Sequence, residues 1–172
     1  EGGPIARRVI LRPGAVYGPY DRAFLAYFKM IKKGFRPVIG DGGRIFQAVY
    51  GPDAAEACVA ALGAFPGEPR AYFINPAEKV TWEEFGLLVG ESCRFRPFAL
   101  RIPEVLIRAS QATLMRLWPS ARSSGDRLGD LLHARWEADS SRARAELGWS
   151  AGVPVREGLE KTYRWYVERG WL

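Results

Sequence analysis

The sequence has few features of a disulfide-bonded, membrane-spanning or disordered chain. It contains only two cysteines in 172 residues, which excludes a disulfide scaffold. Its apolar runs, such as residues 57–62, are far shorter than the ~18 residues that a membrane span needs. Hydrophobic residues make up 48% of the chain and charged residues 26%, which excludes a disordered or collagen-like composition. These exclusions leave a globular domain, and the chain is long enough for that domain to bury a core of its own.

The sequence also lacks any run of five or more basic residues, although its net charge is +6 and its isoelectric point is about 9.6. Because the basic residues are scattered, we expect no nucleic-acid partner. We expect no membrane partner either. The surplus of positive charge fits a site for an anionic small molecule, or an ordinary solvated surface.

Neither cysteine has metal-binding spacing or a CxxC partner, so we expect no metal site. Cys58 lies among small apolar residues of an expected helix, and Cys93 follows another helix. We interpret both as buried thiols in a reducing compartment, which predicts a cytoplasmic protein.

Hydrophobic periodicity and turn residues predict alternating strands and helices. Strands are expected at residues 9–11, 46–50 and 71–74. Helices are expected at residues 21–33, 54–62, 81–91, 103–118, 140–147 and 154–169. Residues 120–130 are polar and contain glycine, which predicts a mobile loop. The order predicts one unit over residues 1–172, of class α/β with a short parallel sheet.

Polar residues mark the starts of several of these helices. Asp21 and Asp53 are interpreted as N-caps, whose carboxylates accept hydrogen bonds from the first free amides. Thr81 and Glu84 have the spacing of a capping box. Gly148 is expected to end the helix at residues 140–147.

The expected sheet is too small to stand alone. A parallel sheet needs cover on both faces, and two or three short strands cannot form one. The sequence also begins with Glu1 rather than Met, and a core-like strand follows almost at once. We therefore expect the sheet to be one edge of a larger sheet, and the sequence to be a piece of a longer protein.

Three motifs in order resemble one enzyme family. Residues 11–19 read LRPGAVYGP, residues 40–53 contain GDG followed by a strand and Asp53, and residues 136–166 contain the segments ELGW, EGL and WY. This pattern, which covers the whole chain, is similar to that of the extended short-chain dehydrogenases/reductases, the NAD-dependent epimerase/dehydratase family. The match is to the C-terminal half of that family.

The resemblance implies the last edge of a Rossmann-type sheet joined to a small, mostly helical substrate-binding domain. The family's GxxGxxG loop and its Tyr-x-x-x-Lys pair, which carries the acid/base tyrosine, are missing from this sequence. NAD or NADP would therefore bind in a longer parent protein, and the chain alone is expected to bind neither and to be inactive. The parent would be an epimerase, dehydratase or reductase, with a nucleotide sugar as one possible substrate.

The resemblance also implies site residues. The cofactor's nicotinamide side would meet Pro13, Gly14 and Val16, at the carboxyl end of a strand, where open α/β sheets bind ligands. The substrate would meet Ala15, Tyr17, Arg44, Phe46, Arg127, Arg135 and Trp136. No residue of this chain is assigned a catalytic role.

The sequence departs from the family at the phosphate-binding positions. Sugar-nucleotide members usually have Asn where Ala15 stands, and Arg where Phe46 and Gly129 stand. Losing a bidentate phosphate clamp is a large change. Either Arg44 and Arg127 replace it from shifted positions, or the substrate is less polar and is not a sugar nucleotide. A third alternative is a non-catalytic binding or structural module.

Overall fold

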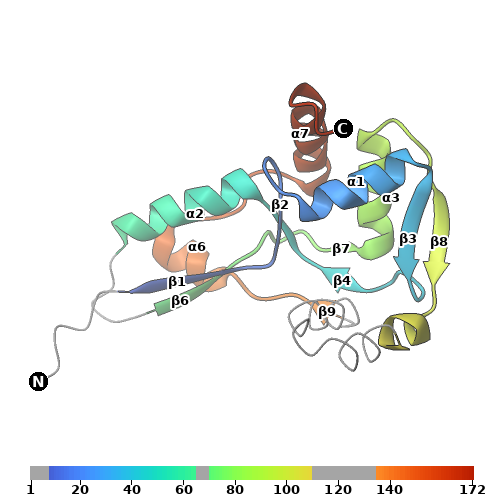
Figure 1. Ribbon diagram of the computed structural model, residues 1–172. Helices are drawn as coiled ribbons and strands as arrows, with labels where there is room; N and C mark the ends of the chain where they lie inside the picture. The colour runs from blue at the N-terminus through green and yellow to red at the C-terminus, as the bar shows by residue number, and fades with distance from the viewer. Residues whose placement is uncertain (1–7, 65–69, 110–134) are drawn as a thin grey trace, which may run out of the picture.

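A computed structural model describes residues 8–64, 70–109 and 135–172, in which short strands alternate with helices (Figure 1). The strands are β1 (Val9–Pro13), β2 (Ala15–Tyr17), β3 (Phe35–Ile39), β4 (Ile45–Phe46), β5 (Ala48–Tyr50), β6 (Arg70–Ile74), β7 (Val80–Thr81), β8 (Phe98–Ile102) and β9 (Arg135–Trp136). The helices are α1 (Ala23–Lys32), α2 (Gly51–Gly63), α3 (Trp82–Ser92), α6 (Ser141–Leu147) and α7 (Val155–Glu168). Residues 104–109 are also helical. The α/β class is confirmed.

The strands form several small sheets in place of the single sheet that the sequence predicts. The pairs β1–β6, β2–β5 and β3–β8 are each parallel, and β4 lies between β7 and β9. The strand expected at residues 46–50 is interrupted at Gln47, so β4 and β5 join different sheets. The parallel pair β3–β8 was not expected, because Pro37 weakens the strand signal of β3.

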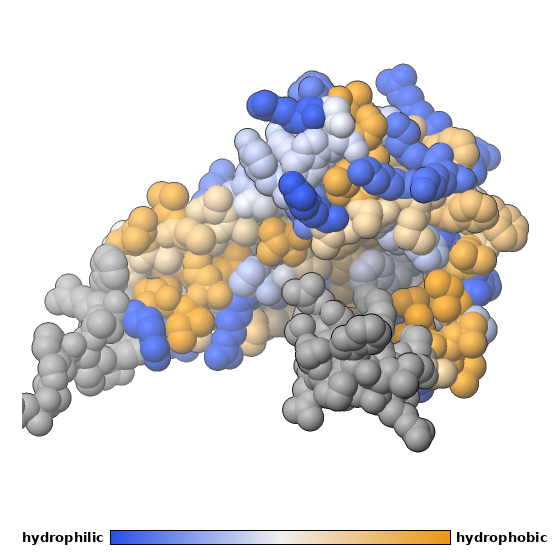
Figure 2. Space-filling view, viewed as in Figure 1, coloured by the Kyte–Doolittle hydropathy of each residue, from blue (hydrophilic) through white to orange (hydrophobic). Residues whose placement is uncertain are grey.

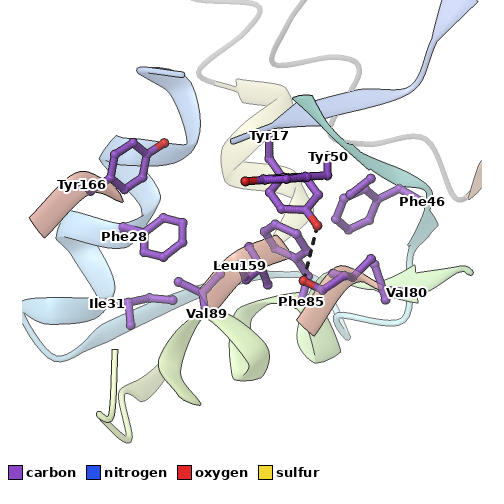
Figure 3. Close-up of a cluster of buried hydrophobic side chains, with 12 residues drawn as sticks. Tyr17, Phe28, Ile31, Phe46, Tyr50, Val80, Phe85, Val89, Leu159 and Tyr166 are labelled. Carbon is purple, nitrogen blue, oxygen red and sulfur yellow. Dashed lines mark hydrogen bonds between the residues drawn. The ribbon is translucent and has the colours of Figure 1, made fainter. Parts of the chain in front are cut away.

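Two buried clusters hold these elements together. One lies between α1, α3 and α7 and is half aromatic, with Tyr17, Phe28 and Phe85 all fully buried (Figure 3). The other lies beneath α2 and α6, on the β1–β6 pair, and includes Tyr72 and Trp149. The first cluster therefore fixes the end of the molecule that carries β3 and β8, and the second fixes the β1–β6 end (Figure 1).

Two of the expected helix starts are confirmed. The Thr81 hydroxyl accepts from the Glu84 amide at 3.1 Å, and the Glu84 carboxylate accepts from the Thr81 amide at 2.8 Å. The Asp21 carboxylate accepts from the amides of Ala23 and Phe24 at the start of α1. Gly148 ends α6 in the left-handed conformation, with φ of 63°.

The interpretation of Asp53 as an N-cap is wrong. Helix α2 begins two residues earlier, at Gly51, because Pro52 suits the first turn of a helix. The buried Asp53 carboxylate instead accepts from the amides of Gly152 and Val153, at 3.1 and 3.0 Å. Asp53 therefore ties the segment before α7 to the start of α2.

The interpretation of Cys58 as a buried thiol is also wrong. Cys58 is exposed on α2, since Ala57 and Ala61 form the buried face of that helix. Cys93 is half-buried, and burial raises the pKa of its thiol to about 11. Within the described ranges, none of the helices combines the length and the apolar character needed to cross a bilayer.

The stability of the chain is expected to fall as the pH is lowered from 4.5 towards about 2, through the carboxylate of Glu146. Hydrogen bonds from Tyr72, Arg70 and Arg142 lower the pKa of this carboxyl from 4.5 to about 2. A folded-state pKa below the unfolded value stabilises the fold above the unfolded pKa, and this stabilisation is lost on acidification. Urea unfolding at several pH values measures the effect, and Glu146→Gln should flatten the slope in this range.

The chain is also expected to self-associate. Among the described residues β1 pairs with β6 alone, so its other edge presents amides and carbonyls that no described strand takes up. Open edges of this kind favour pairing with a second copy. Sedimentation at increasing concentration is expected to show a rising mass, and a mass that stays monomeric at micromolar concentration would contradict the prediction.

Candidate functional site

A polar cleft lies at the carboxyl ends of the parallel strands β1 and β6, where α/β folds bind ligands. Its volume is about 350 Å³. The described residues that line it come from the segments after β4, β6 and β9, and they are Gln47, Asn75, Pro76, Ala77, Lys79, Glu137, Ala138, Asp139, Ser140 and Arg144. Three distant parts of the sequence therefore meet at one place.

The loop expected to face the cofactor borders this cleft. Pro13 ends β1, Gly14 follows it, and Val16 is 40% exposed in β2. The Gly14 amide donates to Asn75 Oδ1 at 2.7 Å. A Cβ atom on Gly14 would lie 2.5 Å from that oxygen and 2.8 Å from the carbonyl oxygen of Gln47. Only glycine fits this close approach between β1 and the cleft wall.

Gln47 is the central residue of the cleft, and the sequence reasoning missed it. Its buried side chain donates through Nε2 to the carbonyl of Pro76 at 2.7 Å, and accepts at Oε1 from the amide of Ala138 at 2.8 Å. Its own amide donates to the carbonyl of Trp136. Gln47 thus joins both walls of the cleft. The sequence signal that could have identified Gln47 is its position as the single amide side chain within the apolar segment 45–50.

The charged groups at the rim of the cleft are already paired. Glu137 contacts Lys79 at 2.6 Å and Arg135 at 3.1 Å. The hydrogen bond from Lys79 and the charge of Arg135 lower the pKa of the Glu137 carboxyl. Arg135 and Trp136 form β9, where Trp136 is 49% exposed and stands in register with Phe46. The structure therefore brings these three predicted site residues together.

Phe46, which occupies a phosphate-binding position of the family, belongs to the core. It is buried, and its ring stacks on Trp82 with centroids 4.3 Å apart. Arg44 forms an ion pair with Glu104 at 2.6 Å, with only 10% of the arginine side chain exposed. Arg127, and the loop expected at residues 120–130, lie outside the described residues.

Tyr17 is also a core residue, and Ala15 lies beside the core. Tyr17 is fully buried, and its hydroxyl donates to the carbonyl of Val155 at 3.3 Å (Figure 3). Burial raises the pKa of Tyr17, so the phenol stays neutral at physiological pH. Ala15 is partly buried and packs against the same aromatic cluster.

A second cavity, of about 380 Å³, lies between α1, the β3–β8 pair and Trp82. The described residues that line it are Ala23, Phe24, Tyr27, Pro37, Ile39, Trp82, Ile102 and Ile107. None of these carries a charge at neutral pH, since the one titratable group is the Tyr27 phenol, whose pKa burial raises to about 12. We call this cavity the apolar pocket. It suits an uncharged hydrocarbon group.

Comparison with known proteins gives relatives but no matching family model. The chain is 29% identical to a ceramide reductase of Caulobacter vibrioides, over 95% of the chain and 52% of the relative. It is 30% identical to 4-hydroxy-2-methyl-3-oxo-4-farnesyl-3,4-dihydroquinoline-1-oxide ketoreductase of Stigmatella aurantiaca, over 92% of the chain and 49% of the relative. The chain thus spans about half the length of these curated relatives.

The fold agrees with that of solved nucleotide-sugar enzymes. UDP-glucuronic acid 4-epimerase of Bacillus cereus, solved with UDP-glucuronic acid and NAD, superimposes with a TM-score of 0.69 at 20% identity. The match covers 95% of this chain and 46% of that enzyme. In sequence and in fold, the chain matches about half of an extended short-chain dehydrogenase/reductase of the NAD-dependent epimerase/dehydratase family, in agreement with the C-terminal half that its motifs predict.

Proposed function

We propose that this chain is the substrate-binding portion of an NAD(P)-dependent dehydrogenase or reductase that acts on an apolar substrate. The observation that carries the proposal is the apolar pocket, whose described lining is uncharged. A substrate with a hydrocarbon portion would place that portion against Ile39, Ile102 and Trp82. Each buried methylene contributes about 0.8 kcal/mol to binding.

The state of the phosphate-binding positions supports the same choice. A diphosphate removed from water needs charge-assisted hydrogen bonds, which arginine supplies best. Phe46 supplies none, and Arg44 is held by Glu104. Recruiting Arg44 for phosphate would break its contact with Glu104, which would keep Arg108 at 3.8 Å as its partner.

The names of two relatives support the proposal further. One is a ceramide reductase and the other a ketoreductase for a farnesyl-bearing compound. Both names describe substrates with long hydrocarbon portions, joined to a group that is reduced. The apolar pocket offers a place for such a portion in this chain.

A nucleotide sugar is the second candidate substrate. The observation that favours it is the fold match to an enzyme solved with UDP-glucuronic acid. Arg135 would be one phosphate partner among the described residues, since it is 66% exposed and contacts Glu137 of the cleft lining. It would first have to leave Glu137.

The nicotinamide side of NAD or NADP would lie beside Pro13, Gly14 and Val16, and the cofactor would supply hydride transfer when bound. This segment borders the polar cleft through the hydrogen bond from Gly14 to Asn75, and residues 13–16 carry no charged side chain. No described helix of this chain begins with a GxxGxxG loop, so we expect negligible binding of NAD or NADP by the chain alone.

The test is cofactor turnover by the full-length protein. We expect NAD(P)H absorbance to change with long-chain ketones or secondary alcohols. We expect no product from UDP- or dTDP-linked sugars, and this is followed by chromatography because an epimerase or dehydratase returns the hydride to its substrate and leaves the absorbance unchanged. Turnover with the sugar nucleotides alone would favour the second candidate. An absence of turnover with either class, in protein that binds NAD(P), would leave only the non-catalytic binding module and would overturn the proposal.

A further inference from the structure

One face of the β3–β8 sheet is entirely apolar. The strands pair in parallel with Phe35 beside Phe98, Pro37 beside Leu100, and Ile39 beside Ile102. Alternate residues of a strand share a face, so all six of these side chains lie on the same side of the sheet. On the opposite side, Arg36 and Val38 are buried.

This face is exposed to an unusual degree. Phe98 is 73% exposed, Phe35 51% and Leu100 44%. The helical residues Val105 and Leu106, which follow β8, are 67% and 58% exposed. Figure 2 shows apolar residues gathered at this end of the molecule. Single exposed apolar residues are ordinary, but a continuous group of them marks an interaction surface. We call these five residues the docking face.

Positive charge borders one end of the docking face. Lys32 and Lys33 lie shortly before β3, Arg94 and Arg96 lie shortly before β8, and all four are exposed. Residues 29–41 and 94–109 together contain eight Lys or Arg and two Asp or Glu, and seven of these cations are exposed, since Arg36 is buried against Glu83. One of these two carboxylates, Glu104, is paired with Arg44. An apolar surface bordered by cations complements the headgroup region of an anionic bilayer.

The docking face is continuous with the apolar pocket. Pro37, Ile39 and Ile102 lie on the same side of the sheet as Phe35, Phe98 and Leu100, and they line that pocket. A substrate with a long hydrocarbon portion is concentrated in a bilayer rather than in water. The sheet face that contacts the bilayer would therefore lead into the pocket that takes the substrate. This link rests on the function proposed above.

We propose that the docking face binds the surface of an anionic lipid bilayer and draws the apolar substrate from it. The sequence alone predicts no membrane partner, because it contains no apolar run long enough to span a bilayer. Surface binding needs no such segment; it needs exposed apolar side chains and neighbouring cations, and β3 and β8 bring both together only in the folded chain.

The test is co-sedimentation of the purified protein with phosphatidylcholine vesicles, with and without phosphatidylserine. We expect binding only when phosphatidylserine is present. The paired substitution Phe98→Ser and Leu100→Ser should abolish binding, and Lys32→Glu with Lys33→Glu should weaken it by roughly fivefold or more for each cation removed. Val59→Ser with Leu62→Ser on α2, and Arg164→Glu with Arg169→Glu, are matched controls that should bind as the unmodified protein does.

The outcomes separate this proposal from the proposed function. Loss of vesicle binding with unchanged affinity for a soluble apolar ketone supports docking as a separate property. Vesicle binding by a protein that binds no apolar ketone would contradict the proposed function but would still support lipid binding by the docking face. The lipid proposal would be overturned by equal binding to both vesicle types or by no binding to either. It would also be overturned if the Phe98 and Leu100 variant lost self-association while the unmodified protein bound no vesicles. Each variant is first checked for an unchanged unfolding transition.

Discussion

Replacing Gly158 with alanine is expected to destabilise the chain by about 3 kcal/mol or more. Gly158 lies in α7, where an added Cβ atom would overlap the hydroxyl of Tyr17 and lie 2.9 Å from its Cζ atom. Tyr17 is fully buried among Phe24, Phe85 and Tyr50, so its ring has no room to move. The clash far outweighs the helix propensity that alanine gains.

Two further variants isolate the cause. Gly63→Ala, at the end of α2, places its Cβ in open space and is expected to be neutral or slightly stabilising. Tyr17→Phe combined with Gly158→Ala removes the overlapping hydroxyl and should recover part of the loss. Urea unfolding gives the free energies. Equal effects of alanine at residues 63 and 158 would show that Tyr17 and α7 do not meet as described.

Replacing Ile39 with lysine is expected to weaken binding of an apolar ketone by about 100-fold. Ile39 lines the apolar pocket from the end of β3 and is only partly buried, so the fold should tolerate the change. The ammonium group would either lose hydration when the ligand binds or occupy the space the ligand needs. Calorimetric titration with a medium-chain ketone, in buffer without vesicles, measures the affinity.

The matched control for this substitution is Leu62→Lys, which adds the same charge on α2 at a position that is 68% exposed. Its affinity for the ketone should equal that of the unmodified protein. Ile39→Val, which keeps the pocket apolar, should change the affinity only slightly. An Ile39→Lys protein that binds the ketone normally would contradict the placement of the ligand in the apolar pocket.

Local patterns predict the features that depend on neighbouring residues in the sequence. The capping box of Thr81 and Glu84 satisfies amides within three residues, and Gly148 ends α6 through its own backbone conformation. Strand β6 is recognisable because its apolar residues are consecutive and a turn follows them. The motif resemblance placed the chain in its family correctly.

Features that depend on distant pairing could not be predicted in this way. Strand β3 contains Pro37 and is recognisable only through its partner β8, which lies some sixty residues later. Asp53 has the local pattern of a cap, but the amides it satisfies belong to residues 152 and 153. Arg44 was proposed for phosphate, and its partner Glu104 is equally distant in the sequence. Each of these features depends on a contact between residues far apart in the sequence, which a pattern of neighbouring residues does not contain.

The most direct measurement of the central claim is methyl NMR of isoleucine-labelled protein, titrated separately with a medium-chain ketone and with UDP. The ketone is expected to shift the methyl signals of Ile39, Ile102 and Ile107, which line the apolar pocket, and to leave that of Ile74 in the β1–β6 core unchanged. UDP is expected to shift none of them at concentrations where the ketone saturates. Shifts of the three pocket signals by UDP, with no response to the ketone, would contradict the placement of an apolar substrate in this pocket.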